Sequence, residues 1–161
     1  MNGDKPTTKQ DLRARIQARL GELALEDRAV RSRVICERVA ELPVWKNARV
    51  VALFEAMDSE PQIELLVDEL RRRGSEIIFI LPSARRHEDV PIASVLDLVL
   101  VPGVAFTRDG RRLGRGAGFF DRFLAHRAQR AVKIGVCFNF QIVDSLVVET
   151  HDVKVDLVVT D

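Results

Sequence analysis

The sequence has few cysteines and no long apolar segment. Its 161 residues include two cysteines, Cys36 and Cys137, whose separation matches neither a disulfide framework nor a metal-ligand motif. No apolar run approaches the roughly eighteen residues of a membrane-spanning helix, and the first ten residues lack the apolar core of a signal peptide. We therefore expect a cytoplasmic protein whose thiols are reduced and packed as small apolar groups.

The chain also lacks an excess of charge of either sign. Lys and Arg total 25 while Asp and Glu total 24, so the formal net charge is +1. A general nucleic-acid binder or a polybasic membrane binder needs a large cationic excess, and we expect neither partner. With 47% apolar residues the composition is globular, and the length fits a single domain over residues 1–161, with 1–6 disordered.

Apolar residues at helical spacing predict four helices. The first spans residues 9–25 behind a Thr7 or Thr8 cap, and the second is capped by Asp27 and ends before Pro43. The inward residues of the second helix are expected to be Val30, Val34, Ile35 and Leu42. A third helix has Pro61 in its first turn and ends at Gly74, and a short fourth helix spans 120–127.

Short continuous apolar runs predict five strands that are buried on both faces. These runs are residues 48–54, 76–81, 96–101, 132–138 and 155–160. Strands that alternate with helices indicate an α/β fold, here one domain of three layers with a mostly parallel sheet and helices on both faces. Ligands of such folds bind in the loops beyond the carboxyl ends of the strands.

The most informative loop is RRLGRGAGFFDR, residues 111–122. Its alternating glycines let backbone amides approach a ligand closely, and the helix that follows favours anions at its N-terminus. The arginines of the loop match phosphate oxygens, and Asp121 suits a hydrated magnesium that bridges phosphates. From the residues alone, a tight turn without a ligand is an equally good interpretation.

This loop and its neighbours resemble the 5-formyltetrahydrofolate cyclo-ligase family, also called 5,10-methenyltetrahydrofolate synthetases. The resemblance covers nearly the whole chain and rests on the order of the segments KQDLRARI, FEAMDSEPQIELLVDELRRRG, DLVLVPGVAF, RRLGRGAGFFDRFL, IGVCFNFQIV and HDVKVDLVVTD. It implies an ATP- and magnesium-dependent ligase that converts 5-formyltetrahydrofolate to 5,10-methenyltetrahydrofolate. Its partners would be folate and ATP, bound by a monomer or a weak homodimer.

The resemblance also implies the site residues. Those matching the ATP contacts are Lys9, Arg13, Arg112, Leu113, Gly114, Arg115, Gly116, Ala117, Gly118, Phe119 and Phe120. Those matching the substrate contacts are Glu55, Glu60, Arg115 and Phe119, and those associated with magnesium are Asp121 and Asp152. The catalytic charges would be Arg112 and Arg115. Without the resemblance, Lys9 and Arg13 could lie on an ordinary solvated helix face, Asp152 in a turn, and Glu60 beside a helix cap.

Two features depart from the family pattern. The family has tyrosines where this chain has Phe119 and Phe120, and the sequence contains no tyrosine. The family also carries a longer excursion than the short segment 83–96, and Trp45 does not replace the aromatic residue lost there. These departures leave open a non-catalytic nucleotide-binding module, or a ligase that acts on a different acceptor.

Overall fold

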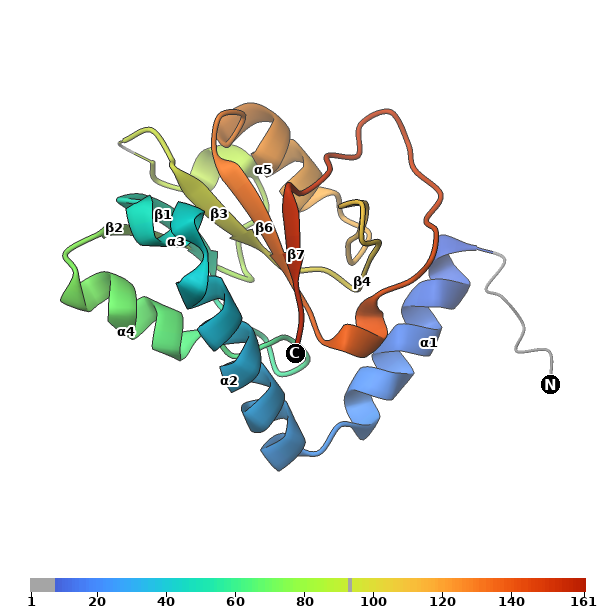
Figure 1. Ribbon diagram of the computed structural model, residues 1–161. Helices are drawn as coiled ribbons and strands as arrows, with labels where there is room; N and C mark the ends of the chain where they lie inside the picture. The colour runs from blue at the N-terminus through green and yellow to red at the C-terminus, as the bar shows by residue number, and fades with distance from the viewer. Residues whose placement is uncertain (1–7, 93) are drawn as a thin grey trace.

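A five-stranded parallel sheet forms the centre of the protein (Figure 1). The structure is a computed structural model that describes residues 8–92 and 94–161. The strand order is β2-β1-β3-β6-β7. The strands are β1 (Val50–Phe54), β2 (Glu76–Ile80), β3 (Leu98–Val101), β6 (Val132–Val136) and β7 (Leu157–Val159). Every predicted strand is therefore present, and each is shorter than its apolar run because the ends of the runs enter turns.

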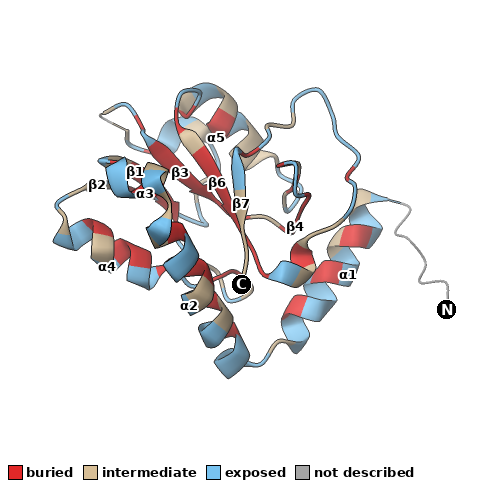
Figure 2. Ribbon diagram, in the orientation of Figure 1, coloured by how far each residue is buried: buried red, intermediate tan, exposed pale blue. Residues whose placement is uncertain are grey.

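Helices cover both faces of this sheet, as the patterning predicted. The helices are α1 (Lys9–Glu22), α2 (Leu25–Glu41), α3 (Pro43–Asn47), α4 (Glu64–Arg72) and α5 (Phe119–Arg127), with short 3-10 turns η1 (His87–Asp89) and η2 (Asn139–Gln141). Apolar residues of α1 to α4 share one core with inward side chains of β1, β3 and β6. Residues of α5 form a second core with the opposite sides of β1, β2 and β3. The buried strands between these layers are visible in Figure 2.

The first helix shows how local sequence sets an element boundary. Thr8 caps α1, because its hydroxyl accepts from the Asp11 N–H while the Asp11 carboxylate accepts from the Thr8 N–H. The helix ends at Glu22, earlier than predicted, and Leu25 already begins α2. The guanidinium of Arg19 lies 4.6 Å from the ring centroid of Phe140, which packs α1 over η2.

Three details of the helix predictions are wrong. The cap of α2 is Ala24 rather than Asp27, which lies in the first turn instead. Val30 is 65% exposed, because the buried side of α2 runs through Ile35 and Val39. Pro61 precedes α4, whose first residue is Glu64, since Pro61 belongs to the turn that leads into the helix.

The sequence analysis missed a small hairpin. Strands β4 (Ala105–Phe106) and β5 (Arg112–Leu113) pair antiparallel between β3 and the glycine loop. Its turn uses Gly110, where a side chain would collide with the Val155 carbonyl. The hairpin brings residues 112–118 back over the carboxyl end of the sheet.

The two thiols behave as predicted from their sequence context. Cys36 and Cys137 are both free and buried. Burial raises the pKa of Cys36 to about 11 and that of Cys137 to about 12, so both are protonated near neutral pH. Across the described residues, every helix is too short or too polar to cross a membrane.

Candidate functional site

The predicted site residues meet in one cavity. It has a volume of about 410 Å³ and lies beyond the carboxyl ends of β1, β2 and β3. All the residues that the sequence indicated line it: Lys9, Arg13, Glu55, Glu60, Arg112, Leu113, Gly114, Arg115, Gly116, Ala117, Gly118, Phe119, Phe120, Asp121 and Asp152. Segments from both halves of the chain therefore converge on one space.

The cavity has two chemically different ends. The apolar end follows β1 and β2 and is lined by Phe54, Met57, Ile80, Leu81, Pro82 and Ala84. The charged end is lined by Lys9, Arg13, Glu149, His151, Asp152 and the glycine loop, residues 112–118. The strand β2, at one edge of the sheet, lies two positions from β3, which corresponds to about 10 Å between these two strands.

The backbone of the glycine loop adopts conformations that residues with a side chain rarely adopt. Gly116 has φ 118° and Gly118 has φ 68°, both in the region that favours glycine. Gly118 is also the cap of α5, and no side chain caps this helix end. The first N–H groups of a helix lack partners within it, so the start of α5 offers donors and a partial positive charge to an anion.

Two arginines fix the loop through its carbonyl groups. The Nε of Arg13 donates to the Gly114 carbonyl at 2.8 Å, and the Nη1 of Arg122 donates to the Ala117 carbonyl at 2.9 Å. Arg13 thereby connects α1 to the loop although the two are far apart in sequence. Each of these two contacts is made to a backbone carbonyl and not to a carboxylate.

Arg112 is almost fully buried. Its Nη1 donates to the Pro102 carbonyl at 3.2 Å and its Nη2 lies 3.4 Å from the Asp121 carboxylate. Its guanidinium is 5.6 Å from the ring centroid of Phe120, and its Nε has no hydrogen-bond partner in the described structure. Burial lowers the pKa of Arg112, while the Asp121 carboxylate opposes that shift.

Arg115 reaches across the cavity from the glycine loop. Its Nη2 donates to the Ser59 hydroxyl at 2.9 Å and lies 3.4 Å from the Glu60 carboxylate. Glu60 is buried, and its other oxygen accepts from the Met57 N–H at 2.9 Å. The turn of residues 57–60 therefore holds Arg115 in place through a buried carboxylate.

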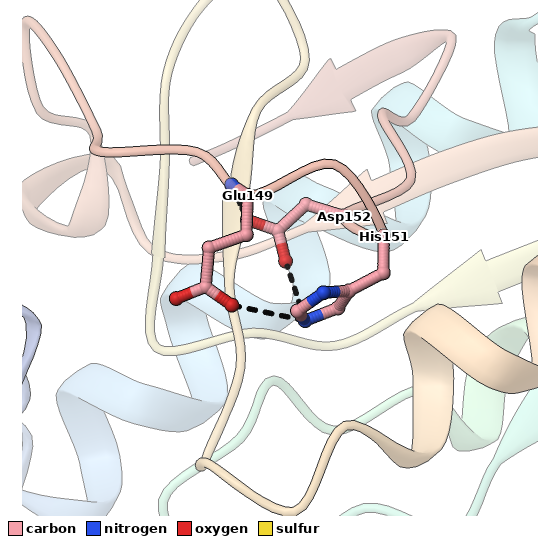
Figure 3. A group of neighbouring side chains, drawn as sticks. All are labelled: Glu149, His151 and Asp152. Carbon is pink, nitrogen blue, oxygen red and sulfur yellow. Dashed lines mark hydrogen bonds and ion pairs between the residues drawn. The ribbon is translucent and has the colours of Figure 1, made fainter.

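A cluster of three side chains closes the charged end (Figure 3). Ligand atoms of Glu149, His151 and Asp152 all lie within 4.8 Å of one another. The sequence analysis missed Glu149 and His151, although they lie within three residues of Asp152. The ammonium of Lys9 is 3.1 Å from Glu149 and 3.4 Å from Asp152.

The contacts between Lys9 and this cluster raise the pKa of Lys9 and lower the pKa of Asp152. Burial opposes both charges, but the hydrogen bond from Lys9 to Glu149 and the charge of Asp152 raise the pKa of Lys9. Asp152 accepts from the Glu149 N–H at 2.8 Å, and this bond together with Lys9 lowers the pKa of Asp152 in spite of burial. Both groups are charged at neutral pH.

Asp121 lies apart from this cluster. One of its oxygens accepts from the Val153 N–H at 3.1 Å, and the other lies 3.4 Å from Arg112. The carboxylate thus connects the start of α5 with the segment after Asp152. Asp121 and Asp152 line the same cavity, and in each carboxylate at least one oxygen already accepts a hydrogen bond from the protein.

The chain is similar to known proteins over nearly its whole length. The chain is 29% identical over 166 residues to a 5-formyltetrahydrofolate cyclo-ligase of Mycoplasma pneumoniae, covering 95% of this chain and 98% of that protein. It is 26% identical over 186 residues to the cyclo-ligase of Mus musculus, covering 93% and 92%. The fold matches a solved 5,10-methenyltetrahydrofolate synthetase from Mycoplasma pneumoniae with a TM-score of 0.79 and 24% identity, over 96% of this chain and 99% of that one.

The family model assigns nearly the whole chain. It matches residues 5–92 and 79–161 under the description 5-formyltetrahydrofolate cyclo-ligase family. The short segment 83–96 lies inside this match, so it does not separate the chain from the family. The chain belongs to the 5-formyltetrahydrofolate cyclo-ligase family.

Proposed function

We propose that this protein uses ATP to convert 5-formyltetrahydrofolate to 5,10-methenyltetrahydrofolate. Family membership implies ATP as co-substrate and a folate as substrate. The observation that carries the proposal is that one cavity has both a charged end and an apolar end. A triphosphate and a pterin need these two environments side by side.

The charged end holds the ATP phosphates in this proposal. Glycine-loop amides and the start of α5 donate to phosphate oxygens, and Arg13 adds a charge that is not paired with a carboxylate of the described residues. Arg112 contributes a buried charge from within the protein. Lys9 reaches the phosphates by leaving its contacts with Glu149 and Asp152, which are partly exposed.

Magnesium suits the carboxylates of this end. It prefers oxygen ligands and keeps several waters, so it needs only one or two carboxylates beside the phosphates. Asp152 and Glu149 offer such oxygens, and Asp121 retains acceptor capacity beyond its two contacts. These residues would hold the ion, which when bound neutralises charge on the phosphates.

The apolar end holds the folate in this proposal. Phe54, Met57 and Leu81 offer apolar surface to the pterin, and Glu55 and Glu60 offer acceptors for its N–H groups. Phe119 and Phe120 pack edge to face with ring centroids 5.4 Å apart between the two ends. They supply ring surface without the hydroxyl groups that the family's tyrosines carry.

The reaction then has two stages. The formyl oxygen attacks the γ-phosphorus of ATP, so that an O–P bond forms while the bond to ADP breaks, and the product is a phosphorylated imidate. N10 attacks the formyl carbon next, the C–O bond breaks, and phosphate leaves with N10 losing its proton. Arg115 lies between the two ends and stabilises the charge that develops on the transferred group.

Absorbance of the methenyl product tests this function. Purified protein mixed with ATP, magnesium and 5-formyltetrahydrofolate should produce the absorbance of 5,10-methenyltetrahydrofolate, and omission of ATP should abolish it. We expect Arg115→Ala to lower kcat by about 100-fold. A matched control is Arg108→Ala, an arginine of the β4–β5 turn that does not line the cavity.

The same preparation separates the proposal from a non-catalytic module. ATP binding in calorimetry together with no product formation by folded protein would contradict the ligase activity and favour nucleotide binding alone. Absence of ATP binding would contradict both.

A further inference from the structure

One arginine at the apolar end is not used by the proposed chemistry. Arg85 lines the cavity next to Ala84 and Pro82, on the short segment that follows β2. It is exposed, and it forms no hydrogen bond or ion pair with any described residue. The other arginines that line the cavity, Arg13, Arg112 and Arg115, all have internal partners.

The adjacent arginine differs in both respects. Arg86 lies 3.6 Å from the Glu88 carboxylate, and it does not line the cavity. Two neighbours of the same residue type therefore have different surroundings: Arg86 has an acidic partner outside the cavity, whereas Arg85 lines the cavity without a charged partner among the described residues. An unmatched guanidinium at the edge of a binding cavity suits an anionic group of the ligand.

The chemistry of the substrate supplies such a group. In 5-formyltetrahydrofolate the reacting N5 and N10 lie between the pterin and a benzoyl-glutamate tail with two carboxylates. When the formyl oxygen lies at the γ-phosphate near the glycine loop, the tail must extend away from the phosphates. The phosphates and the tail are both anionic, so they also repel each other.

We propose that Arg85 binds the glutamate carboxylates of the folate and so determines specificity for the tailed substrate. The inference rests on the proposed function. Arg85 follows the edge strand β2, about 10 Å across the sheet from β3, which leads to the glycine loop. This separation lets one elongated molecule place its formyl group at the loop and its tail at Arg85. The segment 83–96, short as it is, thereby contributes a charge to substrate recognition.

A comparison of two substrates tests this role. 5-Formyltetrahydropteroate keeps the pterin and N10 but lacks the glutamate. We expect the wild-type protein to bind 5-formyltetrahydrofolate about three- to tenfold more tightly than 5-formyltetrahydropteroate, as measured by calorimetry. In Arg85→Gln this ratio should fall to about one, with kcat and the KM for ATP unchanged.

The matched control is Arg86→Gln, which should keep the ratio of the unchanged protein. A ratio that stays the same in Arg85→Gln would overturn the inference, and so would a raised KM for ATP, which would assign Arg85 to the nucleotide. If the unchanged protein binds neither folate nor pteroate, the proposed function itself fails. Normal folate binding with an unaltered ratio in the variant removes only the role of Arg85.

Discussion

The two ends of the cavity differ in whether their cationic side chains already contact acceptors of the protein. At the charged end Lys9, Arg13, Arg112 and Arg115 each contact a protein acceptor before any ligand is present. At the apolar end the strand ends supply mostly apolar surface, and Arg85 has no partner among the described residues. The cations of the charged end are thus already paired within the protein, whereas the apolar end offers mainly apolar surface.

The charged end itself contains two kinds of cation. Arg13 donates to a backbone carbonyl and keeps its charge available for an anion. Lys9 and Arg115 face carboxylates, which neutralise them until a phosphate replaces those partners. The first kind organises the loop, and the second must exchange partners when the ligand binds. Substitutions that separate these roles test the comparison.

The largest effect is expected for Arg112→Leu. The change leaves Asp121 without its cationic partner and removes the donor to the Pro102 carbonyl, both close to the core. Loss of one partner from a buried pair costs roughly 3 kcal/mol of folding free energy. Urea unfolding should show this loss, and ATP should no longer raise the Tm.

The neighbouring Arg111 provides the control for this prediction. It is partly exposed and lies 3.3 Å from Asp109 in the same hairpin. Arg111→Leu should change the free energy of unfolding by less than about 1 kcal/mol. Equal losses in the two variants would show that Arg112 is not a buried structural charge.

A smaller effect is expected for Gly118→Ala, which alters the loop backbone alone. Gly118 has φ 68°, and an added Cβ would lie 3.0 Å from Arg122 Nη1. Gly74 has a similar φ of 71° at the end of α4, where an added Cβ meets nothing within 4 Å. Each alanine should cost about 1 kcal/mol of stability through its backbone. Only Gly118→Ala should also weaken ATP binding, by about tenfold in calorimetry.

If Gly74→Ala weakened ATP binding as much as Gly118→Ala, the effect would come from general destabilisation. The glycine loop would then have no special part in binding the nucleotide.

The sequence predicted most of the sheet, and the site residues that it indicated through the family resemblance all line one cavity. Buried parallel strands form apolar runs that are visible without a structure, as in residues 98–101. Gly116 has a backbone conformation that other residues rarely adopt, so the glycines of this loop can be recognised in the sequence without knowledge of distant contacts. The resemblance to the family then related Lys9 and Asp152, which no local pattern connects.

What the sequence could not predict depends on contacts between distant segments. Val30 fits a helical stripe, yet it is exposed because α2 packs against the core through Ile35 and Val39 instead. The strands of the β4–β5 hairpin have two residues each, too few for a periodic pattern. Glu149 and His151 join the cavity only because the segment after η2 folds back against Lys9.

A third substitution, Glu60→Gln, tests the connection between the two ends. It removes the charge opposite Arg115 but keeps an oxygen that can accept from the Met57 N–H. If Glu60 accepts from the pterin, the KM for 5-formyltetrahydrofolate should rise about fivefold, while the KM for ATP stays within about twofold. The steady-state KM for each substrate measures this. A larger rise for ATP than for folate would show that the Glu60 carboxylate acts only through Arg115 and does not bind the pterin.

The smallest effect is expected for a carboxylate outside the cavity, Asp97. It accepts from the Arg49 and Val50 N–H groups at 2.8 and 2.9 Å, and these bonds lower its pKa below the ordinary value of 3.8. Its stabilising contribution is therefore complete above pH 3.8 and is lost as the pH falls through the lower folded pKa.

Asp97→Asn should lower the free energy of unfolding at neutral pH by less than about 1 kcal/mol, because the side chain is exposed. The difference from the unchanged protein should shrink below pH 3.8 in urea unfolding, and ATP should raise the Tm of both proteins equally. The exposed Asp144, changed to Asn, serves as the control. A smaller rise of the Tm with ATP in Asp97→Asn would mean that a charge outside the cavity also affects ATP binding. The difference between the two ends would then not depend on the residues that line the cavity alone.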